Sequence, residues 1–124
     1  PLVGARIAAG FPSPADDFID RKLDLNDLLV RHPAATFFVR VEGSSMTGAG
    51  IHSGDILVVD RAVEPADQKI VIALLNGELT VKRIRRRRDQ IWLLPENPAF
   101  PPIAIGPDTP FEVWGVVTSV IHAL

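Results

Sequence analysis

The chain has 124 residues, a formal net charge of −2, and 47% hydrophobic residues. This length is enough for one compact domain but not for two ordinary ones. No apolar run approaches the ~18 residues that a transmembrane helix needs, so we expect no membrane association. The absence of cysteine excludes disulfides and cysteine metal sites, and it fits a cytoplasmic location.

The first 15 residues predict an extended, flexible arm. They show no sustained hydrophobic period and carry four breakers besides Pro1, namely Gly4, Gly10, Pro12 and Pro14. We therefore divide the chain into an N-terminal arm, residues 1–15, and one domain, residues 16–124. A short helix is predicted next, because Asp24 is a good N-cap before three leucines and the residue before Pro33 avoids the helical conformation.

After this helix the sequence predicts strands. Segments with strand composition are residues 36–41, 56–59, 69–75, 91–94 and 112–121. Asn76-Gly77 predicts a hairpin between residues 70–75 and 79–84, since both residues readily adopt the positive φ angles of a type I′ turn. A proline-rich loop, residues 95–102, precedes the last strand. One helix and several short strands without β-α-β alternation predict a mostly β fold of twisted antiparallel sheets.

Charge is distributed unevenly, with aspartates early in the chain and arginines in the middle. The run Arg85–Arg88 is the one candidate for contacting phosphates, but along the sequence no aromatic residue interrupts it and no helix-turn-helix pattern accompanies it. We interpret it as a solvated strand end and turn, with acid-base pairing between subunits as a competing use. We do not expect direct DNA binding.

Ser45 and Lys82 are the candidate catalytic residues. A serine hydroxyl needs a base, and a lysine can serve only if its amine is neutral near pH 7, which burial without a carboxylate partner favours. Ser45 lies in the turn sequence Gly-Ser-Ser-Met, and strand alternation puts Lys82 on one face with Thr80 and Ile84. Taken singly, each has an ordinary explanation: a serine-rich turn, and an exposed lysine on a half-solvated sheet.

Together these residues carry a family resemblance. The Gly-x-Ser-Met sequence, the hairpin leading to Lys82 and the interval of thirty-seven positions between Ser45 and Lys82 resemble the LexA/UmuD family of Ser-Lys autopeptidases. The dipeptide Ala9-Gly10, thirty-five positions before the serine, resembles the cleavage site of that family. The short leader and the segments 10–16 and 111–117 are most similar to its UmuD branch.

The resemblance implies a LexA C-terminal/signal-peptidase-like fold and a role for each residue. It implies that Ser45 is the nucleophile, that Lys82 is the general base, and that the chain cuts its own Ala9-Gly10 bond. By analogy, the backbone N–H groups of Ser44 and Ser45 form the oxyanion hole. Ser44 departs from the UmuD pattern, in which we associate this position with aspartate.

The resemblance also implies partners. We expect a homodimer, cleavage stimulated by the RecA-single-stranded DNA filament, and association of the shortened form with a UmuC-like subunit of an error-prone translesion DNA polymerase in SOS mutagenesis, part of the response to DNA damage. No cofactor is expected. No metal site is expected either, because His32, His52 and His122 have no spacing that sets two ligands on one face. We interpret Trp92, Trp114 and the phenylalanines as core residues.

Two rival functions are compatible with the same residues. The chain could be the C-terminal autocleavage and dimerisation domain of a LexA- or phage-type transcriptional repressor, in which case a helix-turn-helix domain would precede it. Alternatively, it could be a catalytically inactive interaction module that keeps only the fold. Release of a fragment that begins at Gly10 would exclude the second of these.

Overall fold

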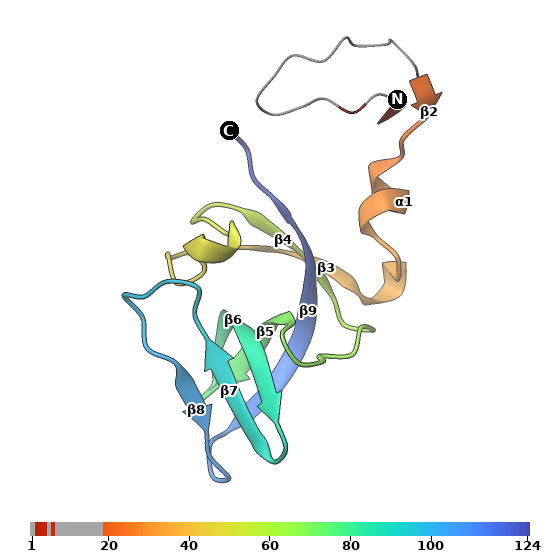
Figure 1. The fold of residues 1–124 in the computed structure, drawn as a ribbon. Coiled ribbons are helices and arrows are strands. Elements are labelled where there is room, and N and C mark those ends of the chain that lie inside the picture. The colour runs from red at the N-terminus through yellow and green to blue at the C-terminus, as the bar shows by residue number, and fades with distance from the viewer. Residues whose placement is uncertain (1, 5, 7–18) are drawn as a thin grey trace. The chain divides into compact units, whose positions relative to one another are not determined.

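The structure is a computed structural model that describes residues 2–4, 6 and 19–124. The chain separates into two compact units, Pro1–Arg31 and His32–Leu124 (Figure 1). The predicted boundary between residues 15 and 16 lies outside the described residues, as does the Ala9-Gly10 dipeptide. Both stay predictions.

The first unit contains one short helix and one small pair of strands. β1 (Leu2–Val3) pairs antiparallel with β2 (Ile19–Arg21), and α1 spans Leu25–Leu29. Asp24 is the N-cap, and its Oδ1 accepts a hydrogen bond from the Asn26 backbone N–H at 2.9 Å. This confirms the predicted helix. No helix in the described part of the chain is long and apolar enough to cross a membrane.

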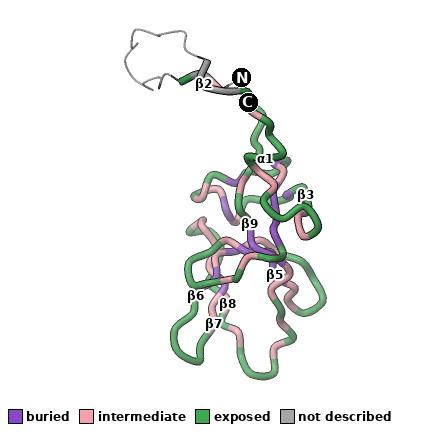
Figure 2. The backbone as a smooth tube through the Cα atoms, turned by 90° about the vertical axis from the view of Figure 1, so that its right-hand side faces the viewer, coloured by how far each residue is buried: buried purple, intermediate pink, exposed green. Residues whose placement is uncertain are grey.

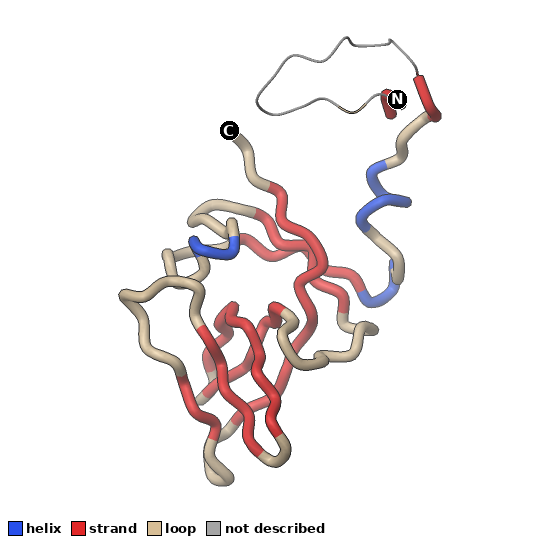
Figure 3. The backbone as a smooth tube through the Cα atoms, in the orientation of Figure 1, coloured by secondary structure: helices blue, strands red, loops and turns tan. Residues whose placement is uncertain are grey.

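The second unit is built on one antiparallel sheet of seven strands in the order β3-β4-β9-β5-β6-β7-β8. Figure 3 shows that strands make up most of its regular structure. The strands are β3 (Thr36–Arg40), β4 (Ile56–Asp60), β5 (Ile70–Leu75), β6 (Glu78–Arg87), β7 (Gln90–Leu94), β8 (Ile103–Ile105) and β9 (Phe111–Ile121). Two single 3-10 turns, Pro33–Ala35 and Thr47–Ala49, precede β3 and β4. The predicted mostly β, antiparallel fold is confirmed.

The β5-β6 hairpin forms where the sequence predicts it. Asn76 and Gly77 have φ angles of 50° and 82°, and Leu75 pairs with Glu78 across the turn. β6, however, continues past its predicted end at Ile84 to Arg87, because β7 pairs with it along this whole stretch. β8 was not predicted. Its three residues lie between prolines and a glycine, too few to show a strand pattern.

Two hydrophobic clusters form the core of this unit. The first contains Val41, Met46, Ile51, Leu57, Val59 and Ile72, and the second contains Val71, Ala73, Ile84, Leu93 and Val116. Figure 2 shows that the buried segments gather in the strands at the centre of the sheet. The prediction that the phenylalanines are core residues is wrong for Phe37, Phe38 and Phe100, which are 43%, 57% and 39% exposed. Phe37 and Phe38 lie on the edge strand β3, and Phe100 lies in the loop before β8.

The close contact between β9 and β4 gives a test of this packing. A Cβ atom on Gly115 would lie 2.6 Å from Cγ1 of Val59, a fully buried side chain that has no room to move. We therefore expect Gly115→Ala to lower the free energy of unfolding by about 1–3 kcal/mol, measured by urea denaturation. The control is Gly106→Ala, where the nearest contact is an ordinary 3.4 Å. Equal stability of the two variants would contradict the packing described here.

Candidate active site

Ser45 lies in the loop that follows β3. The base of this loop is fixed by two backbone hydrogen bonds, from Val41 N to Asp55 O at 2.9 Å and from Gly54 N to Val41 O at 2.8 Å. On the far side of the serine, Met46 is 1% exposed and belongs to the first core cluster. Ser45 therefore sits on a short turn that is anchored on both sides by buried residues.

A second segment, Glu96 and Asn97, forms hydrogen bonds to this loop, and the sequence did not predict it. Glu96 N donates to Ser45 O at 2.8 Å, and Asn97 Nδ2 donates to Ser44 O at 2.9 Å. Gly48 N donates in turn to Glu96 O at 2.7 Å, and a Cβ on Gly48 would lie 2.5 Å from that oxygen. Only glycine fits this close approach. The sequence hinted at this support only through Pro95 and Pro98, which flank Glu96 and Asn97 and restrict their backbone.

Lys82 projects from β6 toward Ser45. The residue is 8% exposed, and its Nζ atom lies 3.0 Å from Ser45 Oγ, 2.8 Å from Thr80 Oγ1 and 3.1 Å from the Val81 carbonyl oxygen. No carboxylate of the described residues forms an ion pair with it. Burial therefore lowers the pKa of the Lys82 amine from its ordinary value of 10.5. The structure brings the two predicted residues into direct contact.

The three oxygen atoms around Lys82 Nζ determine how the amine is oriented. An ammonium group has three N–H donors, one for each oxygen. Once the amine has lost a proton, Thr80 Oγ1 and Val81 O can still accept its two remaining N–H bonds, which leaves the nitrogen lone pair directed at the Ser45 hydroxyl. Thr80 is thus a positioning residue for Lys82. The sequence placed it on the same face without revealing this contact.

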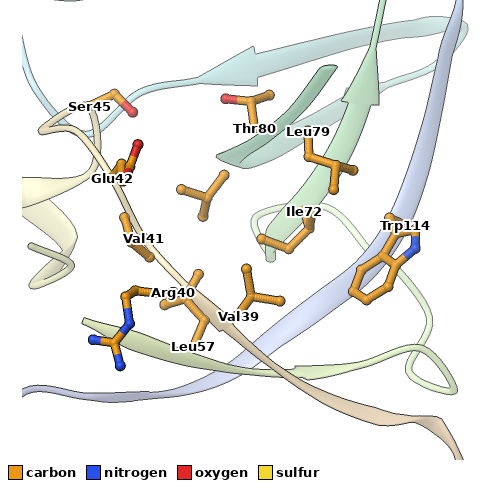
Figure 4. Close-up of a pocket in the computed structure, with 11 residues that line it drawn as sticks. Val39, Arg40, Val41, Glu42, Ser45, Leu57, Ile72, Leu79, Thr80 and Trp114 are labelled. Carbon is orange, nitrogen blue, oxygen red and sulfur yellow. The ribbon is translucent and has the colours of Figure 1, made fainter. Parts of the chain in front are cut away.

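A cleft of about 450 Å³ opens beside the serine. Figure 4 shows Ser45 at one end of it and Trp114 at the other, with Val39, Ile72 and Leu79 between them. Arg40 and Glu42 are the charged residues of its lining. Because most of this lining is aliphatic or aromatic, the cleft suits a chain segment with small or apolar side chains.

Two of the three histidine side chains pair with aspartates, which the sequence did not predict. His122 Nδ1 is 2.5 Å from Asp55 Oδ1, and His32 Nδ1 is 2.5 Å from Asp60 Oδ2. The pKa of Asp55 is lowered chiefly by the hydrogen bond from the His52 backbone N–H, and that of Asp60 chiefly by its bond to His32. Although the His52 and His122 rings are 5.1 Å apart, no group of three potential ligands in the described residues could hold a metal.

Comparison with known proteins decides the family. The sequence matches the Peptidase S24-like family over residues 1–118. The chain belongs to this family. Protein SamA of Salmonella typhimurium is 51% identical over 122 residues, which cover 98% of this chain and 84% of SamA. Protein MucA of Escherichia coli is 48% identical over 119 residues, covering 95% and 81%. The LexA repressor of Bordetella avium is 41% identical over 126 residues, covering 100% and 58%.

These relatives confirm the predicted resemblance to the LexA/UmuD autopeptidases. As a Peptidase S24-like protein, the chain is a serine peptidase that cleaves itself, and it belongs with the SOS mutagenesis proteins of this family.

The environment of Lys82 makes a testable prediction about its titration. We expect its amine to titrate below pH 10.5, followed by the NMR shift of the side-chain ε-carbon and assigned by loss of the signal in Lys82→Arg. Because folding lowers this pKa, the unfolded chain binds the proton more tightly. Stability should therefore rise with pH between the folded-state pKa and 10.5, a slope that Lys82→Met should remove. A titration at or above 10.5 would contradict the burial argument.

Proposed function

We propose that Ser45 and Lys82 form a catalytic dyad that cuts the chain's own Ala9-Gly10 bond. The observation that supports this most is the 3.0 Å contact between Lys82 Nζ and Ser45 Oγ, made by a buried amine that has no carboxylate partner among the described residues. A base with these surroundings can be neutral while the serine hydroxyl beside it still carries its proton.

In the first step the neutral Lys82 amine takes the proton of the Ser45 hydroxyl as Oγ attacks the carbonyl carbon of Ala9. The tetrahedral intermediate collapses when the C–N bond breaks and the Lys82 ammonium gives its proton to the departing amine of Gly10. Ser45 is left as an ester of the N-terminal fragment. In the second step a water molecule, deprotonated by Lys82, hydrolyses this ester and restores the dyad.

The oxyanion formed in each step needs hydrogen-bond donors. The backbone N–H groups of Ser44 and Ser45 support this role, since neither donates to a backbone carbonyl among the described residues. The carbonyl groups of the same two residues are held by Asn97 and Glu96. Ser44 O lies in the same peptide plane as Ser45 N–H, so the Asn97 hydrogen bond fixes this donor before substrate arrives, which is what preorganised stabilisation requires.

The biological role we propose is that of the UmuD branch. Self-cleavage, stimulated by the RecA-single-stranded DNA filament, would convert the chain into an accessory subunit for a UmuC-like translesion polymerase. Identity is higher to SamA and MucA, 51% and 48%, than to the LexA repressor, 41%, and this supports the mutagenesis role over the repressor alternative.

Mass spectrometry of the purified chain tests the dyad and the cleavage site together. At alkaline pH we expect a fragment that begins at Gly10, formed faster when RecA filament is added. Ser45→Ala should slow its formation by at least about 10³-fold while leaving the fold intact, because a reaction without its nucleophile loses nearly all covalent catalysis. Ser44→Ala is the matched control and should still cleave.

The opposite pattern, with Ser44 essential and Ser45 dispensable, would refute the assigned nucleophile. A fragment that begins elsewhere would refute the assigned bond but not the dyad. Gly10→Val tests the bond independently, since a bulky β-branched residue should hinder entry to a narrow cleft.

The structure also supports the proposed homodimer. β3 is an edge strand, so its outer backbone groups are unpaired within the sheet. The register of β3, β4 and β9 puts Phe38 and Ile121 on the same face, where they are 57% and 43% exposed. Exposed large apolar side chains next to an open edge are typical of a protein interface.

Ile121→Asp should therefore weaken the dimer. A buried apolar contact worth about 2 kcal/mol corresponds to a roughly 30-fold increase in the dimer Kd, which sedimentation equilibrium can measure. Gln90→Glu adds a negative charge at an exposed position on β7 and should leave the Kd unchanged. An unchanged Kd in Ile121→Asp would place the dimer interface elsewhere.

A further inference from the structure

The β6-β7 hairpin carries an exposed run of four arginines, Arg85–Arg88. Arg86 is tied to a neighbouring loop, since its backbone N–H donates to Asp67 Oδ1 at 2.6 Å and its Nε donates to Pro65 O at 3.0 Å. The side chains of Arg85, Arg87 and Arg88 make no hydrogen bond or ion pair with any other residue that the structure describes. All three residues are exposed, on a chain whose net charge is −2, although Arg87 is also close enough to Asp67 to help lower the pKa of that carboxylate.

The hairpin supplies the aromatic residue that the run lacks in sequence. Antiparallel pairing sets Trp92 of β7 directly opposite Arg85, and Gln90 opposite Arg87. Directly paired residues share a face of the sheet, and so do alternate residues along a strand. Arg85, Arg87 and Trp92 consequently stand side by side on one face.

This face is turned away from the core beneath the hairpin. The next pair along, Ile84 and Leu93, points to the opposite face, where both are 0% exposed within the second hydrophobic cluster. Trp92 is only half-buried and belongs to neither cluster, so the expectation that it is a core residue is wrong. Its partner on the other side is the exposed Ala104 of β8, too small to cover an indole ring.

At the turn of the hairpin, the residue type does not suit the backbone conformation. Arg88 has a φ angle of 56°, a left-handed conformation that favours glycine or asparagine. The β5-β6 hairpin has Asn76 and Gly77 at its equivalent turn. Residues in such left-handed conformations are often found at functional sites. A positive charge at this tip is what the strained arginine provides.

We propose that the Arg-Trp face, defined as Arg85, Arg87, Arg88 and Trp92, binds single-stranded nucleic acid. The guanidinium groups contact phosphates, and the Trp92 indole stacks on an unpaired base. A duplex offers the indole no free base, and an acidic polypeptide would use the arginines but not the tryptophan. This inference replaces the expectation that the chain does not contact DNA directly, and it does not depend on the peptidase reaction.

Fluorescence anisotropy of a labelled single strand tests the proposal. The probes are a dT 20-mer, an rU 20-mer that distinguishes RNA from DNA, a 20-base-pair duplex and polyglutamate, each titrated with the full chain at several salt concentrations. We expect tighter binding of a single strand than of the duplex. Affinity should fall with salt, because each phosphate contact adds about 0.7 to the slope of log K against log salt for single strands.

Two kinds of variant separate charge from stacking. Arg85→Ala/Arg87→Ala should weaken binding about tenfold or more and reduce the salt slope by about 1.4. Trp92→Leu should weaken binding by a similar factor but leave the slope unchanged, since stacking releases no counterions. Lys22→Ala/Arg31→Ala removes the same charge at two exposed positions of the first unit and should have little effect.

A third variant, Arg88→Gly, tests whether weaker binding could result simply from a destabilised fold. It relieves the left-handed strain, so we expect a higher melting temperature together with weaker binding. The proposal is overturned if no single strand binds, if the duplex binds as tightly, or if Lys22→Ala/Arg31→Ala weakens binding as much as the hairpin variants. Binding of polyglutamate in preference to the single strands would overturn it in favour of an acidic protein partner.

Discussion

The buried amine of Lys82 is the constraint on which the rest of the site depends. To act as a base it must be kept from water and from carboxylates, yet lie within hydrogen-bond reach of a serine that is distant in sequence. Burying an amine costs stability, and the two hydrophobic clusters on either side of the central strands supply the compensating packing. Local rigidity around the serine loop follows from the same need, because a loosely held hydroxyl would lose contact with the base.

Features fixed by neighbouring residues were predictable from the sequence. The Asp24 cap and the Asn76-Gly77 turn depend on a few adjacent side chains, and both occur as expected. The pairing of Ser45 with Lys82 was predictable for another reason. No local rule brings two residues together across a β fold, but the combined motif and spacing matched a family in which they meet.

What could not be predicted depends on strand register and on long-range contacts. Asp55 contacts His122, and Arg85 lies opposite Trp92, only because the sheet aligns the segments that carry them. Glu96 and Asn97 support the serine loop from a region that read as a proline-rich connection. The run of arginines likewise concealed the last three residues of β6, since charge masks the alternation that indicates a strand.

The position of β9 in the sheet has a consequence for the order of synthesis. Ser45 adjoins the first hydrophobic cluster and Lys82 pairs with Val71 of the second, and β9 is the strand that joins β4 to β5 between them. Both catalytic candidates leave the ribosome before β9 does. A nascent chain thus carries its serine and its lysine before the strand that joins β4 to β5 has been made.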